Sequence, residues 1–288
     1  MTWKRVATAL VLIPIFVAIV LFTNTAVVAI ATSIITVLAL WEYFALGDAI
    51  GHRAYRLWTT FCALLLIYFQ FLNAYDSRVS QPIHFLFGWP IGEPPSLQWV
   101  VFLFVLGLTM FTLWTKRALV EALPAAGISS SALLLTAFPL SYAVPLHGLP
   151  RIGPGLLLFA LAITWAADTT AYFVGRAIGK HPLAPHISPK KTWEGSIGSM
   201  LGSLLVAYAF SFWIRIPLPH LLIMAATGNI AGQMGDLLES AYKRSAGVKD
   251  SGGLLPGHGG ILDRIDALIL CIPVIWYYLV LVNPSIRR

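Results

Sequence analysis

The stretch from Ser240 to Asp266 combines charged residues and glycines in a chain that carries little charge elsewhere. Its carboxylates suit a hard divalent cation, and its cations suit phosphate groups. The cations are Lys243, Arg244, Lys249 and Arg264; the carboxylates are Asp250, Asp263 and Asp266; the glycines are Gly247, Gly252, Gly253, Gly257, Gly259 and Gly260. Apolar segments on both sides are long enough to cross a bilayer, so we interpret the stretch as a site at a membrane surface.

Two pairs of carboxylates have the spacing of one helical face. Asp236 and Glu239 are three residues apart, and so are Asp263 and Asp266. If the pairs end facing helices, their carboxylates repel one another unless a cation compensates them. We expect Mg²⁺ in this position, because it binds hard oxygen ligands and leaves positions for substrate phosphates. A second cation at this position is a further alternative. In another, Asp263 and Asp266 have a purely structural role in ion pairs with Arg264 and Lys243.

The glycine-rich turn before Asp263 favours phosphate binding independently of a metal. Gly257, Gly259 and Gly260 let backbone N–H groups approach an anion, and they precede a predicted helix whose N-terminus carries partial positive charge. His258 in this turn could act as a general base, as a hydrogen-bond donor to phosphate or as a cap of the turn. We favour the last two roles.

A second basic segment lies upstream. Ser188, Lys190 and Lys191 belong to a proline-containing loop that suits a polyphosphate or a lipid phosphate, although a simple anchor at the membrane surface could use the same residues. Asp168 lies in an apolar segment, where an ionisable group is costly unless it faces a partner or a wet cavity. We expect Asp168 to face the substrate, with packing between helices as the alternative.

The composition places these residues in a membrane protein. Apolar residues make up 58% of the chain and charged residues 11%, whereas soluble domains have about 45–50% and about 25%. A helix that crosses a bilayer needs about 20 mostly apolar residues. The segments that qualify are residues 6–22, 25–46, 57–73, 98–114, 129–146, 154–173, 196–213, 219–238 and 261–282. We therefore predict an all-α, polytopic integral membrane helix bundle with eight to nine transmembrane helices. Residues 1–150 would form the scaffold and residues 151–288 the catalytic region.

The positions of Lys and Arg predict the orientation of the chain. With nine spans and a cytoplasmic N-terminus, most of the 19 Lys and Arg residues lie on the cytoplasmic side, as the positive-inside rule requires. They are Lys4, Arg5, Arg53, Arg56, Lys116, Arg117, Arg176, Lys180, Lys190, Lys191, Lys243, Arg244, Lys249 and Arg264. We therefore expect a multi-pass protein of the cell (inner) membrane whose site faces the cytoplasm.

Glu42 lies between Trp41 and Tyr43 at the end of the second predicted span. Aromatic residues are common at membrane interfaces, where a neighbouring carboxylate can reach water. We interpret Glu42 as such an interface residue rather than as part of the site.

The charged stretch resembles the signature of a known family. The run Ser240-x2-Lys243-Arg244-x4-Lys249-Asp250-x-Gly252-x2-Leu255-Pro256-x-His258-Gly259-Gly260-Ile261-x-Asp263-Arg264-Ile265-Asp266 is similar to that of the phosphatidate cytidylyltransferases, also called CDP-diacylglycerol synthases. The upstream segment Ser188-Pro189-Lys190-Lys191-Thr192-Trp193-Glu194-Gly195 resembles the second recurrent segment of that family. The long run is very specific, whereas the first half of the chain matches only as a series of membrane spans.

This resemblance implies transfer of CMP from CTP to phosphatidate, with Mg²⁺, to give CDP-diacylglycerol and pyrophosphate. It implies Asp236 and Asp263 as metal ligands, supported by Asp266 and Glu239. It further implies that phosphates are held by Lys190, Lys191, Lys243, Arg244 and Lys249, and that Arg264 orients the carboxylates or contacts phosphate. The attacking phosphate has a second pKa near ~6, so a strong general base is scarcely required and His258 is not given that role. The expected partners are CTP, phosphatidate and the bilayer, with no nucleic acid; exposed helical faces are compatible with a homodimer.

Two other functions are alternatives to this one. A transporter of ions or small solutes would also place Asp168 and Asp236 in membrane helices, but it needs no basic pairs and glycine turn on one face. A CDP-alcohol phosphotransferase would carry an Asp-Gly-x2-Ala-Arg motif followed by spaced aspartates on one helix, and this chain has no such motif.

Overall fold

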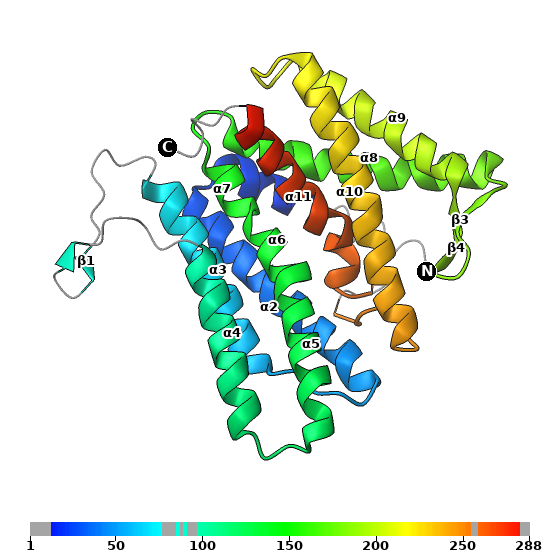
Figure 1. Ribbon diagram of the computed structural model, residues 1–288. Helices are drawn as coiled ribbons and strands as arrows, with labels where there is room; N and C mark the ends of the chain where they lie inside the picture. Colours follow the sequence, from blue (N-terminus) through cyan, green and yellow to red (C-terminus); the bar gives the residue numbers. More distant parts are fainter. Residues whose placement is uncertain (1–12, 77–84, 87–88, 91–96, 255–258, 283–288) are drawn as a thin grey trace.

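Helices make up most of the regular structure in the described residues. The computed structural model describes residues 13–76, 85–86, 89–90, 97–254 and 259–282, with the side chains of residues 75–76, 85–86 and 89–90 left aside. After a short helix over Ile13–Phe22 come α2 (Thr25–Ala49), α3 (Arg56–Asp76), α4 (Leu97–Trp114), α5 (Ala122–Ala132), α6 (Phe138–Ser141), α7 (Ala143–Gly148), α8 (Gly153–Ile178), α9 (Trp193–Phe210), α10 (Leu218–Ser245) and α11 (Leu262–Val282) (Figure 1).

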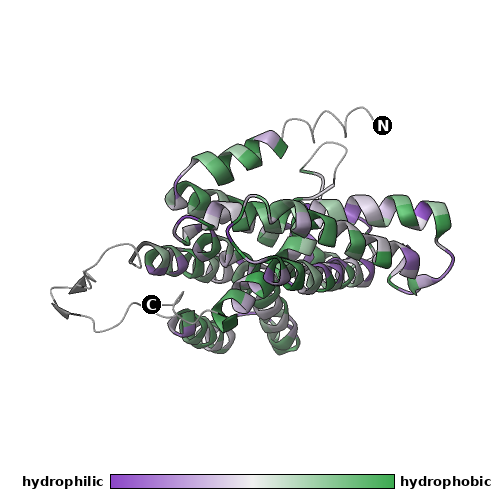
Figure 2. Ribbon diagram, turned by 90° about the horizontal axis from the view of Figure 1, so that it is seen from above, coloured by the Kyte–Doolittle hydropathy of each residue, from purple (hydrophilic) through white to green (hydrophobic). Residues whose placement is uncertain are grey.

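Six of the described helical segments are long and apolar enough to cross a membrane. They are Thr25–Ala49, Arg56–Ala74, Leu97–Trp114, Leu119–Gly148, Gly153–Ile178 and Leu262–Val282. Apolar residues cover most of the helices (Figure 2). The predicted all-α membrane bundle is therefore confirmed, but the count of eight to nine spans is not. Helices α9 and α10 fall short because polar residues such as Ser199, Asn229 and Gln233 interrupt their apolar runs.

The C-terminal helices pack closely in pairs, α8 along α9 and α10 along α11. Glycines permit this approach, because a Cβ at Gly202 would overlap Thr170 of α8 and one at Gly235 would overlap the carbonyl of Asp266. Helix α11 also contacts α2, α6 and α7, so it lies between α10 and the N-terminal helices (Figure 1). Residues from both halves of the chain belong to one buried apolar cluster. The division at residue 150 stays a prediction.

The segment predicted as one span over residues 129–146 lies within the single candidate span Leu119–Gly148, but it is not one regular α-helix. A π-helical turn over Leu133–Ala137 joins α5 to α6, and α7 follows after Tyr142. Pro139 and Pro145 lie in these short helices, and a proline cannot donate the backbone hydrogen bond that a continuous helix requires.

The basic loop over residues 182–192 contains a two-stranded hairpin that the sequence analysis missed. Strand β3 (Pro182–Ala184) pairs antiparallel with β4 (Ser188–Thr192), with Pro182 opposite Thr192 and Ala184 opposite Ser188. Thr192 then caps α9, because its Oγ1 accepts a hydrogen bond of 3.1 Å from the N–H of Gly195. The hairpin therefore presents its lysines next to the start of α9. A second pair, β1 (Phe85–Leu86) with β2 (Trp89–Pro90), lies in the connection between α3 and α4.

Candidate active site

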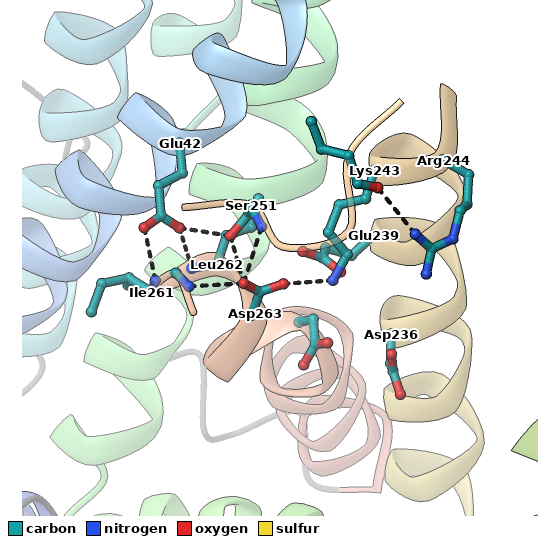
Figure 3. A network of polar contacts seen from close by, with 12 residues as sticks. Glu42, Asp236, Glu239, Lys243, Arg244, Ser251, Ile261, Leu262 and Asp263 are labelled. Carbon is teal, nitrogen blue, oxygen red and sulfur yellow. Dashed lines mark hydrogen bonds and ion pairs between the residues drawn. The ribbon is translucent and has the colours of Figure 1, made fainter. Parts of the chain in front are cut away.

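Asp263 in the first turn of α11 is held by both charge and hydrogen bonds (Figure 3). Its Oδ1 lies 2.5 Å from Nζ of Lys243. Its Oδ2 accepts hydrogen bonds from the N–H groups of Ser251 at 3.0 Å and Gly260 at 2.8 Å. The ion pair between Lys243 and Asp263, which is the structural alternative to a metal site, is therefore present. The glycine turn and the end of α10 meet at this one carboxylate.

Lys243 also forms an ion pair with Glu239, one helical turn earlier on α10. The side chains of Lys243 and Glu239 are only 10% and 6% exposed. Beyond this ion pair, both carboxylate oxygens of Glu239 are buried and accept no hydrogen bond from the described residues. Buried carboxylate oxygens in this state favour an additional positive partner.

Glu42 on α2 was wrongly interpreted as an interface residue that reaches water, because it is only 4% exposed. Its oxygens accept hydrogen bonds from the N–H groups of Ile261 at 3.0 Å and Leu262 at 2.9 Å, and from the hydroxyl of Ser251 at 2.8 Å (Figure 3). The first N–H groups of a helix lack partners within the helix, and a carboxylate satisfies them well. Glu42 therefore joins the N-terminal helices to the charged stretch.

The glycine turn fits closely around Glu42. A Cβ at Gly260 would overlap both the Glu42 carboxylate and the Ser251 hydroxyl, and a Cβ at Gly252 would lie 2.5 Å from Oε1 of Glu42. Gly259 has a φ of +80°, which favours glycine. The predicted site residues Gly257 and His258 lie outside the described residues.

A cavity of about 230 Å³ opens between α8, α9, α10 and β4. The charged residues that line it are Asp168, Lys190, Lys191 and Asp236. Nζ of Lys191 lies 2.5 Å from Oδ2 of Asp236, so this ion pair ties the hairpin to α10. Asp168 is exposed on the cavity side of α8. The cavity thus brings residues of both predicted motifs together.

A chain of amide and hydroxyl groups forms one wall of this cavity. Ser196 donates a hydrogen bond of 2.5 Å to Oε1 of Gln233, and Nε2 of Gln233 donates one of 2.6 Å to Oδ1 of Asn229. Nδ2 of Asn229 donates to the hydroxyls of Ser199 at 2.7 Å and Ser203 at 2.9 Å. The sequence analysis missed this wall. The feature of the sequence that could have predicted this wall is the i, i+4 spacing of Asn229 and Gln233 in an otherwise apolar helix.

Asp266 lies near both the charged residues around Asp263 and those that line the cavity. It interacts electrostatically with Asp236, Glu239 and Asp168, and its Oδ1 accepts a hydrogen bond of 2.7 Å from the N–H of Ala267. Asp236 itself lies outside the hydrogen-bonded network around Asp263 (Figure 3). Among the described residues, no group of three or more His, Cys, Asp and Glu side chains is arranged to hold a metal ion. Asp236 forms an ion pair with Lys191, and Glu239 and Asp263 both form ion pairs with Lys243.

The remaining predicted residues lie around this centre. Arg244 donates a hydrogen bond of 3.4 Å from Nε to the carbonyl of Ile187, which connects α10 to the hairpin. Lys249 and Arg264 are exposed, and Arg264 interacts electrostatically with Asp168. Ser188 begins β4 and is half-buried.

Glu194 holds the base of the hairpin. Its carboxylate accepts a hydrogen bond of 2.6 Å from Nδ1 of His181 and hydrogen bonds from the N–H groups of Lys180 and His181. These hydrogen bonds lower the pKa of Glu194 to about 2, and the one from the His181 side chain has the largest effect. Glu194 is therefore ionised at any physiological pH.

Comparison with known proteins agrees with the resemblance. The model of the Cytidylyltransferase family matches residues 3–282. The phosphatidate cytidylyltransferase of Bacillus subtilis is 41% identical over 142 residues, which cover 49% of this chain and 53% of that protein. Its counterpart in Haemophilus influenzae is 44% identical over 140 residues, covering 46% of this chain and 47% of that protein. The protein of the same name in Staphylococcus saprophyticus is 48% identical over 121 residues, covering 41% and 46%. The chain thus spans about half the length of the curated relatives it matches.

Proposed function

The chain belongs to the cytidylyltransferase family, and we propose that it is a phosphatidate cytidylyltransferase that transfers CMP from CTP to phosphatidate. A phosphate oxygen of phosphatidate attacks the α-phosphorus of CTP. A new P–O bond forms, the bond from that phosphorus to the bridging oxygen breaks, and pyrophosphate leaves. The observation that carries this proposal is the set of lysine–carboxylate pairs between α10, α11 and the hairpin, beside a polar cavity between α8, α9 and α10.

Both substrates are polyanions, so the main task of the protein is to bring them together in line. Lys190 and Lys191 line the cavity and can hold phosphate groups there. Lys191 would exchange its partner Asp236 for a phosphate, since both are anions that compete for one ammonium group. Lys243 lies between Glu239 and Asp263 and can respond in the same way to a second phosphate.

The carboxylates of α10 and α11 fit a bound Mg²⁺ by the chemistry of their donors. Asp236, Glu239, Asp263 and Asp266 offer only hard oxygen ligands, and beyond the ion pair with Lys243 the buried oxygens of Glu239 accept no hydrogen bond from the described residues. When bound, Mg²⁺ neutralises charge on the triphosphate and on the departing pyrophosphate. We assign Asp236 and Asp263 as its ligands, supported by Glu239 and Asp266. Binding of a second cation is an alternative.

Phosphatidate would keep its acyl chains in the bilayer while its headgroup enters the cavity. Apolar side chains exposed along α9, among them Ile197, Leu201 and Leu205, support such a lipid-facing surface. The positive-inside bias supports a site on the cytoplasmic face of the cell membrane. The family match gives no support to the transporter alternative. A homodimer stays a prediction.

An assay of the purified protein tests this proposal. The protein in detergent is mixed with labelled CTP, with and without phosphatidate and Mg²⁺. We expect labelled CDP-diacylglycerol and pyrophosphate only when both are present. Absence of CTP-dependent pyrophosphate release from folded protein in the complete mixture would contradict the proposal.

A further inference from the structure

We propose that Glu42 is a positioning residue for this reaction, which holds Ser251 and the start of α11 so that Asp263 faces the site. The proposal rests on the proposed function above. Glu42 belongs to α2, whereas all its partners at the site belong to the turn and to the start of α11. The contact therefore fixes the charged stretch against a helix that is distant in sequence.

The burial of Glu42 indicates a specific role. Transfer of a carboxylate out of water is unfavourable unless hydrogen-bond donors replace the water. Here the donors are the N–H groups of Ile261 and Leu262 and the hydroxyl of Ser251. Each of them belongs to the segment that carries Asp263. If Ser251 or the start of α11 moved away from α2, the Glu42 carboxylate would lose these donors, so both are strongly restrained.

Ser251 transmits this restraint to Asp263. Its hydroxyl lies 2.8 Å from Oε2 of Glu42 and 3.1 Å from Oδ2 of Asp263. A hydroxyl has one proton and can donate to only one of the two carboxylates at a time. Donation to Glu42 leaves Oδ2 of Asp263 with the N–H groups of Ser251 and Gly260 alone. Glu42 thus holds Ser251 in the position from which the Ser251 N–H donates to Oδ2 of Asp263.

The close fit of the turn makes Glu42 difficult to replace. A side chain larger than hydrogen at Gly252 or Gly260 would collide with the Glu42 carboxylate, so the turn is shaped around this group. An aspartate at position 42 is one methylene shorter and would not reach both N–H groups. A glutamine has the right size, but it replaces one acceptor oxygen by an amide donor, so one of the hydrogen bonds is lost.

The test compares Glu42→Gln with Thr36→Val, a control on the same helix. Thr36 is fully buried, and its hydroxyl has no hydrogen-bond partner among the described residues. We expect Glu42→Gln to lower kcat by about tenfold or more with the KM for CTP changed by less than about twofold. Hydrogen exchange should rise in residues 246–254 and 259–263 and stay unchanged in α3 and α4. Thr36→Val should leave both measurements at the wild-type level.

Two results would overturn the proposal. One is a Glu42→Gln variant with wild-type kcat and wild-type hydrogen exchange. The other is a loss of protection that extends over α3 and α4, which would give Glu42 a role in general stability only. If Glu42→Gln does not fold, Ser251→Ala provides the same test, because it removes the hydroxyl shared by Glu42 and Asp263. Hydrogen exchange reports on Glu42 even if the wild type fails to use CTP, so failure of this inference and failure of the proposed function are distinguishable.

Discussion

Lys191 on the hairpin and Asp236 on α10 form an ion pair, with 2.5 Å between Nζ and Oδ2, beside the cavity between α8, α9 and α10. Lys243 and Asp263 form a second pair with the same separation at the start of α11. Each pair joins a proposed phosphate-binding group to a proposed metal ligand. Without substrate, each lysine and its carboxylate therefore neutralise one another. In the proposed reaction a phosphate replaces the carboxylate at the lysine, and a cation replaces the lysine at the carboxylate.

Replacement of Lys191 by alanine should weaken substrate binding. The variant lacks one cation of the cavity and leaves Asp236 without its partner, which repels incoming phosphates. We expect the apparent KM of at least one of the two substrates to rise by about tenfold, measured by separate titrations of CTP and phosphatidate. Lys180→Ala is the matched control, because Lys180 is exposed near the same hairpin and contacts Glu194 through its backbone N–H. Wild-type KM values for both substrates in Lys191→Ala would contradict the assignment.

Replacement of Gly260 by alanine should disrupt the turn. The added Cβ would collide with the Glu42 carboxylate and the Ser251 hydroxyl, and such overpacking costs about 1–3 kcal/mol. We expect activity to fall by more than about tenfold and the melting temperature in detergent to decrease. Gly253→Ala is the control, because a Cβ at Gly253 has no atom within 4 Å in the described structure. Equal activity of the two variants would show that the close fit around Gly260 is unimportant.

The hairpin should remain anchored at mildly acidic pH. The pKa of Glu194 is lowered to about 2, mainly by the hydrogen bond from the His181 side chain. A carboxyl group with a lowered pKa stabilises the folded state fully above its unfolded value of about 4.3, and this contribution is lost as the pH falls toward 2. Protease resistance of the hairpin in wild type should therefore exceed that of Glu194→Gln by a constant amount from pH 8 to 5. A difference that disappears within this range would contradict the prediction.

Several features of the fold could be predicted from the sequence because they depend on local patterns. The apolar runs that become α2, α4 and α11 have high mean hydropathy over the length of a membrane span, so length and hydropathy identify them. The count of spans could not be settled this way, because α9 and α10 place polar residues on the faces that line the cavity. The β3–β4 hairpin was missed because Pro189 and the adjacent lysines are poor strand formers.

The site was predicted only as far as its residues are close in sequence. The spacing of Asp263 and Asp266 indicated a shared helical face, and the glycine turn before them indicated an anion site. Glu42 could not be assigned from sequence, because its partners at Ser251 and Ile261 lie more than 200 residues away. A carboxylate at the end of an apolar run was a sign of an internal partner, but it does not identify which one.

Turnover by Asp263→Asn tests the central claim most directly, namely that carboxylates from the ends of α10 and α11 allow a nucleotide and a phospholipid to react. Asparagine can still accept the hydrogen bonds from Ser251 and Gly260, but it loses the charge that faces Lys243. We predict that labelled CTP yields less than about 1% of the wild-type CDP-diacylglycerol, while the variant still inserts and folds. Mg²⁺-dependent synthesis near the wild-type rate by the folded variant would contradict the claim.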